Sequence, residues 1–332
     1  MGDKMRGYSV KYIVKRLLGA ALTLYIALTI NFILPRMMGG DPAQYIASQT
    51  AMNSPEYVEL LRREFGLDKG YLAQYGAYFV QLLHLNFGIS YSNFPTEVKT
   101  IILRAMPWTL FIVLTSTLIS FAIAWITGTI CAMKKGSIYD RVHVGVSFYI
   151  QALPYYFVAM MLLMLFAFKL KWFPLSHALS TRARYTTWVG KLGDILYHGF
   201  LPIVSLILVN LAGRMIMMRS NVLQIFSEDY IVLAQAKGLK KSTILSKYAL
   251  RNAMLPSFTG LMTSLGQAVA GAMVTELIFS YPGIGLTIYN AIMNRDYPVI
   301  QGCFAIIAFC TVIMNLVADL IYPLIDPRVS LS

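Results

Sequence analysis

Residues 227–256, SEDYIVLAQAKGLKKSTILSKYALRNAMLP, form the longest polar interval between strongly apolar blocks in the C-terminal half of the chain. Ser227 is a favourable N-cap, and the two carboxylates after it would lie in a first helical turn, where they interact well with the helix dipole. Gly238 can end that helix in the left-handed conformation. Ser242 can cap a second helix that runs to Met254. This polar stretch therefore predicts two short helices.

The first of these helices carries small residues near its end, Ala234, Ala236 and Gly238, which leave a face of low relief. Basic residues follow, and they would hold the segment away from a membrane surface. We expect a helix of this kind to dock into a groove of another protein.

The composition indicates an integral membrane protein. Hydrophobic residues make up 57% of the 332 residues and charged residues only 13%, and the mean hydropathy is +0.61. A soluble domain has about 25% charged residues. The formal net charge of +13 would suggest nucleic acid for a soluble protein. Lysine and arginine on the cytoplasmic side of a membrane explain the same excess, so we expect no nucleic-acid partner.

Apolar blocks along the chain predict an all-α polytopic protein with six transmembrane helices, because about 20 apolar residues cross a bilayer as a helix. The first block follows a basic tail and is longer than a secretory signal core of ~7–15 residues, so we interpret it as a retained helix with a cytoplasmic amino end. The blocks are 17–34, 108–133, 142–168, one that begins at residue 200, 255–275 and 299–318.

These blocks suggest three parts. A basic tail and the first transmembrane helix occupy 1–34, an external helical segment occupies 35–104, and a core of five helices occupies 105–332, with a cytoplasmic loop at 219–254.

Two features could shape a path through the membrane. Pro154 interrupts the third block, and a proline kinks a membrane helix and frees a carbonyl group. Small residues in the fifth block allow close helix packing, and they would equally leave room for a pore. The candidate path residues are Gln151, Pro154, Tyr155, Gly266 and Gly271.

We find no motif of an enzyme or cofactor site. The string closest to a phosphate-binding loop, residues 238–243, lacks the second glycine and the spacing of G-x-x-x-x-G-K-[ST], and neither H-E-x-x-H nor G-x-S-x-G occurs. The four histidines are scattered, and Cys131, Cys303 and Cys310 lie in apolar blocks without metal-binding spacing. We expect a non-catalytic chain without cofactor or metal, whose energy source lies on another chain.

The polar stretch contains Asp229-Tyr230, Ala234, Ala236-Lys237-Gly238-Leu239, LRNA at 250–253 and Leu255-Pro256. This order resembles the cytoplasmic coupling motif of ABC importer permeases, most closely the dipeptide/oligopeptide (peptide/nickel-type) branch. The superfamily motif begins Glu-Ala-Ala, and Val232 stands at the Glu position, so no role of that charge is carried over. In that family the loop fits a cleft on the ATP-hydrolysing subunit. The resemblance implies these coupling residues: Asp229, Ala234, Ala236, Lys237, Gly238 and Leu239.

Further segments resemble the same family. GGDP at 39–42, FGLD at 65–68 and NFGIS at 86–90 match its external segment, which would be a landing surface for a binding protein or a structural cap over the pore. ELIFSYPGIG at 276–285, together with RDYP at 295–298, resembles its external gate-side segment and implies Glu276, Pro282, Gly283 and Gly285 as gate residues. DPR at 326–328 fits the family's tail.

The resemblance implies a type I ABC importer permease fold in a prokaryotic cell membrane, with both termini cytoplasmic. The implied partners are a second, homologous permease subunit in a heterodimer, two cytoplasmic ABC ATPase subunits, an external solute-binding protein and membrane lipid. The implied activity is ATP-driven import of small peptides. Oligosaccharides or nickel chelates are alternative solutes, and a stand-alone channel or ion-coupled carrier is the alternative of another class. The spans lack the ionisable groups that ion-coupled carriers usually place near the midplane.

Overall fold

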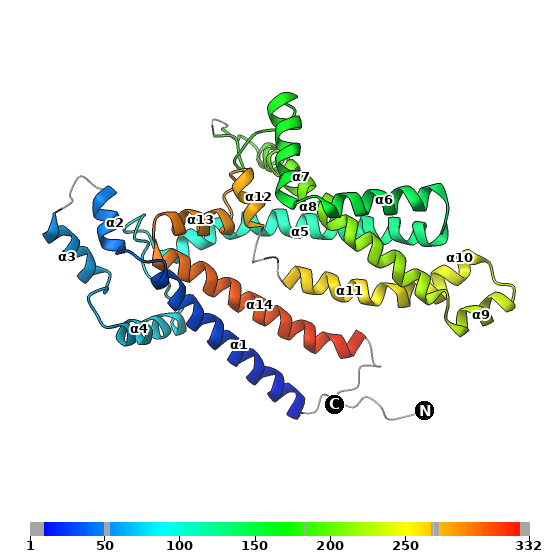
Figure 1. Ribbon diagram of the computed structural model, residues 1–332, viewed down its shortest axis with the longest axis horizontal. Coiled ribbons are helices and arrows are strands. Elements are labelled where there is room, and N and C mark those ends of the chain that lie inside the picture. Colours follow the sequence, from blue (N-terminus) through cyan, green and yellow to red (C-terminus); the bar gives the residue numbers. More distant parts are fainter. Residues whose placement is uncertain (1–9, 50–53, 182–183, 267, 269–271, 326–332) are drawn as a thin grey trace. The chain divides into compact units, whose positions relative to one another are not determined.

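The computed structural model describes residues 10–49, 54–181, 184–266, 268 and 272–325 (Figure 1). Its regular elements are helices, which confirms the all-α class, and among the described residues only Ile89 and Glu97 form an isolated β-bridge. The elements are α1 (Val10–Met37), α2 (Pro42–Gln49), α3 (Pro55–Glu64), α4 (Tyr71–Leu83), α5 (Val98–Met133), α6 (Ile138–Ala152), α7 (Tyr155–Leu162), the π-helical turn η1 (Leu163–Lys169), α8 (Trp188–Ile225), α9 (Asp229–Ala236), α10 (Lys241–Ile244), the π-helical turn η2 (Leu245–Ala249), α11 (Leu250–Gly266), α12 (Met273–Ile278), α13 (Ile284–Met293) and α14 (Tyr297–Ile325).

The long helices confirm a multi-pass membrane protein. Within the described ranges four segments are long and apolar enough to cross a bilayer: Ile13–Met37, Val98–Met133, Trp188–Ile225 and Tyr297–Val317. The bent pair Ile138–Ala152 and Tyr155–Lys169 makes a fifth if it is counted as one span. The block expected at 255–275 includes residues outside the described ranges, so the number six stays a prediction. The division of the chain at residues 34 and 104 also stays a prediction.

The third expected span is broken, where the sequence predicted only a kink. α6 and the α7–η1 segment meet at 100°. Leu153 has an extended backbone with φ −80° and ψ 134°, and Pro154 is the N-cap of α7. The ring of a proline disfavours the helical conformation of the residue before it. Both residues therefore leave the helix, and the chain changes direction there.

The fourth expected span begins earlier than predicted. α8 is 38 residues long, from Trp188 to Ile225, and the Thr187 hydroxyl caps it by accepting a hydrogen bond from the Gly190 N–H at 3.2 Å. The sequence placed the beginning of this span at residue 200 and left residues 188–199 outside it. These residues are three further turns of the same helix.

The described residues fold as two compact units. Unit 1 contains residues up to 109, 272–273 and 282–316, and unit 2 contains residues 110–268, 274–281 and 317–325. In unit 1 the first turns of α5 pack against α13 and the start of α14. The buried side chains of this core include Val98, Ile102, Ile288, Val299 and Ile300.

Asp296 fastens a non-helical part of unit 1. Its fully buried carboxylate accepts hydrogen bonds from the Ser90 hydroxyl at 2.5 Å, the Ser92 hydroxyl at 2.7 Å, and the N–H groups of Tyr91 and Ser92 at 3.1 and 3.0 Å. Buried polar groups of a loop need partners, because an unpaired one costs about 1–3 kcal/mol. One carboxylate between α13 and α14 therefore supplies the acceptors for four donors of the 90–92 segment.

In unit 2, α8 is the central helix and contacts α6, α7 and α11. Arg219 on α8 donates two hydrogen bonds to the buried Asp140 carboxylate on α6, at 2.6 and 2.8 Å. Arg214, also on α8, donates to the Ser120 hydroxyl on α5, and its guanidinium lies 4.1 Å from the centre of the Phe121 ring. Both arginines of the long helix thus have partners inside the unit.

Gly128 of α5 lies against the backbone of α8, which generates a first prediction. A Cβ atom at this position would be 2.7 Å from the Met215 carbonyl oxygen and 2.9 Å from Met218 Cβ. Gly128→Ala should therefore lower the free energy of unfolding by about 1–3 kcal/mol, because the added methyl group overpacks the contact and forces the α8 backbone to shift. Gly145→Ala on α6 is the matched control: nothing lies within 4 Å there, and alanine favours a helix by roughly 0.5–1 kcal/mol. Thermal unfolding in detergent measures both, and equal midpoints would contradict the close approach.

A second prediction concerns Asp296. Asp296→Ala should leave the buried donors of residues 90–92 without acceptors and raise amide hydrogen exchange in that segment, with a loss of stability of about 3 kcal/mol. Asp68→Ala, at an exposed position of the same unit, should change neither quantity. Unchanged protection of Tyr91 and Ser92 in Asp296→Ala would show that the carboxylate does not hold the segment.

Candidate functional site

The polar stretch has a small hydrophobic core of its own. Ile231 and Ala234 of α9 are buried against Ile244 of α10 and Ala249 of η2. Gly238 has a φ of +74°, and its N–H donates to the Gln235 carbonyl at 2.9 Å. This confirms that Gly238 ends the first helix in the left-handed conformation.

The caps of the two helices differ from the prediction. The Ser227 hydroxyl donates to the Gln224 carbonyl at 2.6 Å, in the last turn of α8, and the N-cap of α9 is Glu228. Ser242 lies inside α10, whose N-cap is Lys240. The second helix also does not end at Met254, because α11 continues through Pro256 to Gly266.

The surface of the polar stretch combines apolar and basic side chains. Ala234, one of the predicted coupling residues, is buried, so it packs beneath this surface and is not part of it. Val232 and Leu233 are 55% and 58% exposed, and sequence reasoning did not select them. The spacing of three between Ile231 and Ala234 turns those two inward and the residues between them outward, as helical geometry requires. The other predicted residues that are exposed are Asp229, Ala236, Lys237 and Gly238, and Leu239 is half-buried.

The core of the polar stretch continues into the transmembrane helices of unit 2. Ile225, Phe226 and Leu245 pack both against this core and against a second cluster, whose buried members come from α5, α8 and α11: Ala132, Met218, Val222 and Ala253. The Asn252 amide donates to the Tyr230 hydroxyl at 3.1 Å. Dense side-chain packing transmits displacement, so a force on α9 reaches α8 and α11.

The predicted path residues only partly come together. Tyr155, the first residue of α7, shares a hydrogen bond between its hydroxyl and that of Thr275 on α12. Pro154 is exposed, and Gln151, in the last turn of α6, lies beside Gly213 of α8, where a Cβ atom would be 3.8 Å from its Nε2. Gly266 is the last residue of α11; its surroundings, and Gly271, lie outside the described residues.

The predicted gate residues belong to two different units. In unit 2, Glu276 is completely buried, and its carbonyl accepts from the Tyr281 N–H at 2.7 Å. Burial raises the pKa of Tyr281, and the Glu276 carboxylate raises it further. In unit 1, Pro282 is exposed, Gly283 is the N-cap of α13, and Gly285 is buried.

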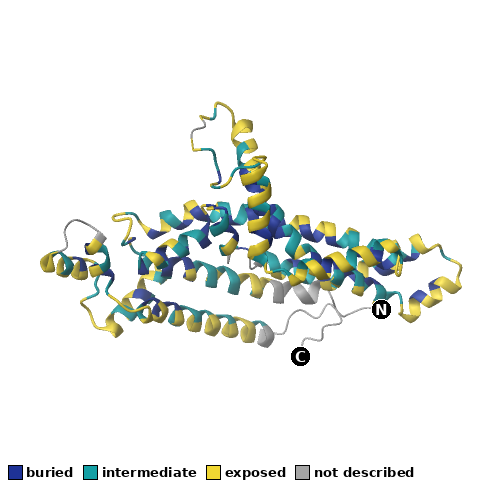
Figure 2. Ribbon diagram, turned by 45° about the horizontal axis from the view of Figure 1, so that its top comes forward, coloured by how far each residue is buried: buried dark blue, intermediate teal, exposed yellow. Residues whose placement is uncertain are grey.

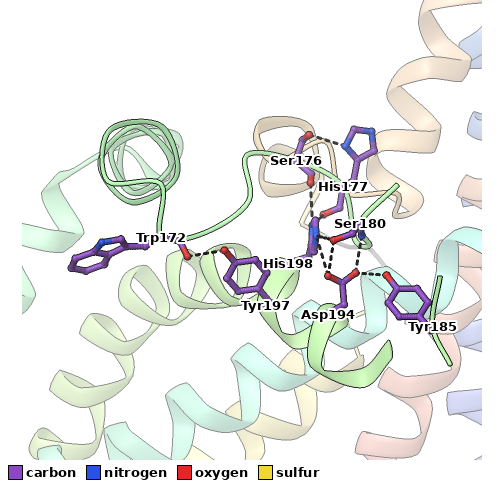
Figure 3. A network of polar contacts seen from close by, with 8 residues as sticks. All are labelled: Trp172, Ser176, His177, Ser180, Tyr185, Asp194, Tyr197 and His198. Carbon is purple, nitrogen blue, oxygen red and sulfur yellow. Dashed lines mark hydrogen bonds and ion pairs between the residues drawn. The ribbon is translucent and has the colours of Figure 1, made fainter. Parts of the chain in front are cut away.

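A network of polar contacts holds the segment between η1 and α8 against the first turns of α8 (Figure 3). The Asp194 carboxylate accepts from the Ser180 N–H and hydroxyl, each at 2.7 Å, and from the Tyr185 hydroxyl at 2.5 Å. This hydrogen bond raises the pKa of Tyr185. Buried His198 lies 3.6 Å from Asp194 through Nε2, and its Nδ1 lies 3.1 Å from the His177 carbonyl oxygen.

This network does not form a catalytic triad. In a triad the carboxylate orients the histidine and the histidine takes the serine proton. Here the Ser180 hydroxyl lies 3.2 Å from His198 Nε2 but donates to the carboxylate itself at 2.7 Å, so the arrangement fastens the loop onto α8. In the sequence His198 was one of four scattered histidines, and the structure places it in this cluster.

Unit 1 contains a cavity of about 440 Å³ within the expected external segment. Cationic side chains, Arg36, Arg63 and Lys69, line it together with aromatic ones, Phe65, Tyr78 and Tyr91. Burial raises the pKa of Tyr91 above its usual range. Within the described ranges no group of three histidine, cysteine or acidic side chains could hold a metal ion.

The comparisons with known proteins agree with this architecture. Residues 124–331 match the family described as "Binding-protein-dependent transport system inner membrane component", and residues 9–113 match its N-terminal family. The chain is 35% identical over 330 residues to a peptide permease protein of Brucella suis, which covers 97% of this chain and 100% of that protein. It is 32% identical to the dipeptide transport system permease DppB of Escherichia coli K12, over 96% of this chain and 98% of that one.

An oligopeptide transport system permease, AppB of Bacillus subtilis, is 31% identical, again over 96% of this chain and 98% of that protein. The matches therefore extend over nearly the whole of each protein and include the polar stretch. The chain belongs to the family of inner-membrane components of binding-protein-dependent transport systems.

Proposed function

We propose that this chain is the permease subunit of an ATP-driven importer that moves small peptides across the cell membrane. Its relatives carry the names of dipeptide, oligopeptide and general peptide permeases. The proposed partners are two cytoplasmic ABC ATPase subunits, a second, homologous permease subunit and an external solute-binding protein. In the proposed topology both termini and the polar stretch are cytoplasmic.

The observation that carries the proposal is the packing of the polar stretch. It exposes Val232 and Leu233 at its surface, while its own core is continuous with α8 and α11. An ATPase cleft that grips these two side chains would move the transmembrane helices of unit 2 with it. ATP can shift the inward-open and outward-open states only by its differential affinity for them, so the connection between cleft and helices has to be stiff.

The assignment of small peptides as the solute rests on the names of the relatives and not on a contact in this chain. Oligosaccharides and nickel chelates remain the alternatives for the same machinery. A channel or carrier that works by itself is the alternative of another class, and it would need no ATPase at the polar stretch.

The third prediction tests the contact surface. Leu233→Asp should leave the chain folded, since the side chain is 58% exposed, yet it should abolish co-purification of the ATPase subunits and ATP-dependent uptake of a labelled dipeptide. Leu60→Asp on α3, where the leucine is 59% exposed, should keep the ATPase bound. Normal co-purification with Leu233→Asp would contradict the proposed surface. Uptake of an oligosaccharide or a nickel chelate in place of the dipeptide by the native complex would reassign the solute.

The fourth prediction concerns Gly238. A leucine in the left-handed conformation costs about 1–2 kcal/mol, so Gly238→Leu should distort the turn between α9 and α10 while the protein still reaches the membrane in normal amounts. We expect ATP hydrolysis to continue with uptake reduced at least tenfold. Gly238→Asn, a residue that tolerates this conformation, should retain coupled uptake. Coupled uptake at the native rate in Gly238→Leu would contradict the role of the turn.

A further inference from the structure

The helix α4 packs along one half of the first transmembrane helix (Figure 1). The Gln74 side chain accepts a hydrogen bond from Arg36, near the Met37 end of α1, at 2.8 Å. One turn further along α4, the Tyr78 hydroxyl accepts from Asn31 at 3.0 Å. The Phe79 ring lies 5.8 Å from the ring of Tyr25. Tyr75, the neighbour of Gln74, also contacts Thr29 and Tyr25 through its hydroxyl, at 2.9 and 3.3 Å. The partners of α4 on α1 thus extend from Arg36 near its end to Tyr25 at its middle.

These contacts place α4 at membrane depth. The span Ile13–Met37 has 25 residues, so Tyr25 is its central residue. Twelve residues separate Tyr25 from Met37, which is about 18 Å along a helix at ~1.5 Å per residue. The hydrocarbon core of a bilayer is about 30 Å thick. A helix whose side chains reach Tyr25 therefore enters the hydrocarbon region.

The sequence of α4 fits that depth. Residues 70–96 contain no lysine, arginine, aspartate or glutamate. Tyr78 of α4 faces α1, and Gln74 and the exposed Gln81 line the cavity of unit 1. Tyr71, the first residue of α4, is 73% exposed, at the end of the helix that lies nearest the charged segment before it. The outward side chains are apolar, with Leu72 88%, Val80 56% and Leu83 82% exposed.

We propose that α4 is a membrane-inserted helix, immersed in the leaflet around the Met37 end of α1, with its outward face covered by lipid acyl chains. This leaflet is the external one in the topology proposed above, and only that assignment rests on the proposed function. Lipid is the occupant because α4 packs against a transmembrane helix that is itself largely uncovered: only 11% of the apolar window of α1 is buried (Figure 2). On the half of α1 that α4 contacts, Ile26, Ile30, Ile33 and Leu34 are exposed.

Insertion of α4 also fixes the position of the preceding segment relative to the membrane surface. α3, with its exposed Glu59, Arg62 and Arg63, lies before α4 and remains in water. The chain between Glu64 and Tyr71 then crosses the interface, where Lys69 is the last charged residue before residue 97. The cavity lined by Arg36, Arg63 and Lys69 would accordingly open at the headgroup level.

The test measures what surrounds each side chain in the assembled transporter in liposomes. Single cysteines at Leu72, Val80, Leu83 and, as control, Leu60 carry a spin label in a background in which Cys131, Cys303 and Cys310 are alanine. Relaxation by dioxygen, which concentrates in acyl chains, is compared with relaxation by a water-soluble nickel chelate. We expect dioxygen to dominate at the three α4 positions and the nickel chelate to dominate at Leu60, an apolar side chain whose exposure of 59% is close to the 56% of Val80.

Two results would overturn the proposal. Nickel-chelate access at Leu72, Val80 and Leu83 as high as at Leu60 would place α4 in water. Low access of both reagents with an immobilised label would show that another protein chain covers it. A photoreactive benzoylphenylalanine at Val80, with the three native cysteines retained, checks the same point without the altered background. This residue should cross-link to phospholipid, so the mass of the protein should increase by that of the phospholipid. Cross-linking to protein alone would count against insertion. ATPase co-purification is scored separately, so a failure here is distinct from a failure of the proposed transport function.

Discussion

The lack of water in a bilayer is the constraint on which this structure depends. Backbone N–H and C=O groups there find partners only within the chain, and an unpaired buried group is costly. The long helices α1, α5, α8 and α14 satisfy this requirement along their own length. Pro107 and Pro202 lie inside such helices without ending them, whereas Pro154 coincides with a complete break. The difference arises at Leu153, whose backbone is already extended.

Where the chain is not helical, carboxylates replace the missing helical partners. Asp296 collects four donors from the 90–92 segment, and Asp194 collects three from the 180–185 segment. Both carboxylates lie close to the start of a long helix, at the N-cap region of α14 and in the second turn of α8. A negative charge is favourable within the first turn of a helix, so the dipole of α14 stabilises Asp296, whereas Asp194 lies one turn beyond that effect and depends on its three donors.

Much of the fold could be predicted from the sequence, because apolar blocks and the left-handed preference of glycine are local signals. The helical class and the turn at Gly238 were predictable in this way. The caps Ser227 and Ser242 were not, because a serine can cap a helix only where its own backbone is extended. α8 continues almost to Ser227, and the extended residue before α10 is Lys240. Likewise, Pro256 suggested a boundary, but α11 packs against α8 on both sides of it.

The candidate site was predictable as a segment but not as a surface. The motif located α9, yet only the packing shows that Ala234 faces inward and that Val232 and Leu233 face outward. The outward pair depends on which side of α9 meets Ile244 and Ala249, and these residues follow later in the sequence. Long-range packing of this kind leaves no trace in a short window of residues.

The ion pair between Asp140 and Arg219 has a consequence for biogenesis. The two residues lie 79 positions apart in the chain, and a buried charge that loses its partner is costly. α6 is synthesised first, so the Asp140 carboxylate lacks the Arg219 guanidinium until α8 has been made. The packing of α6 is therefore completed only when α8 joins it.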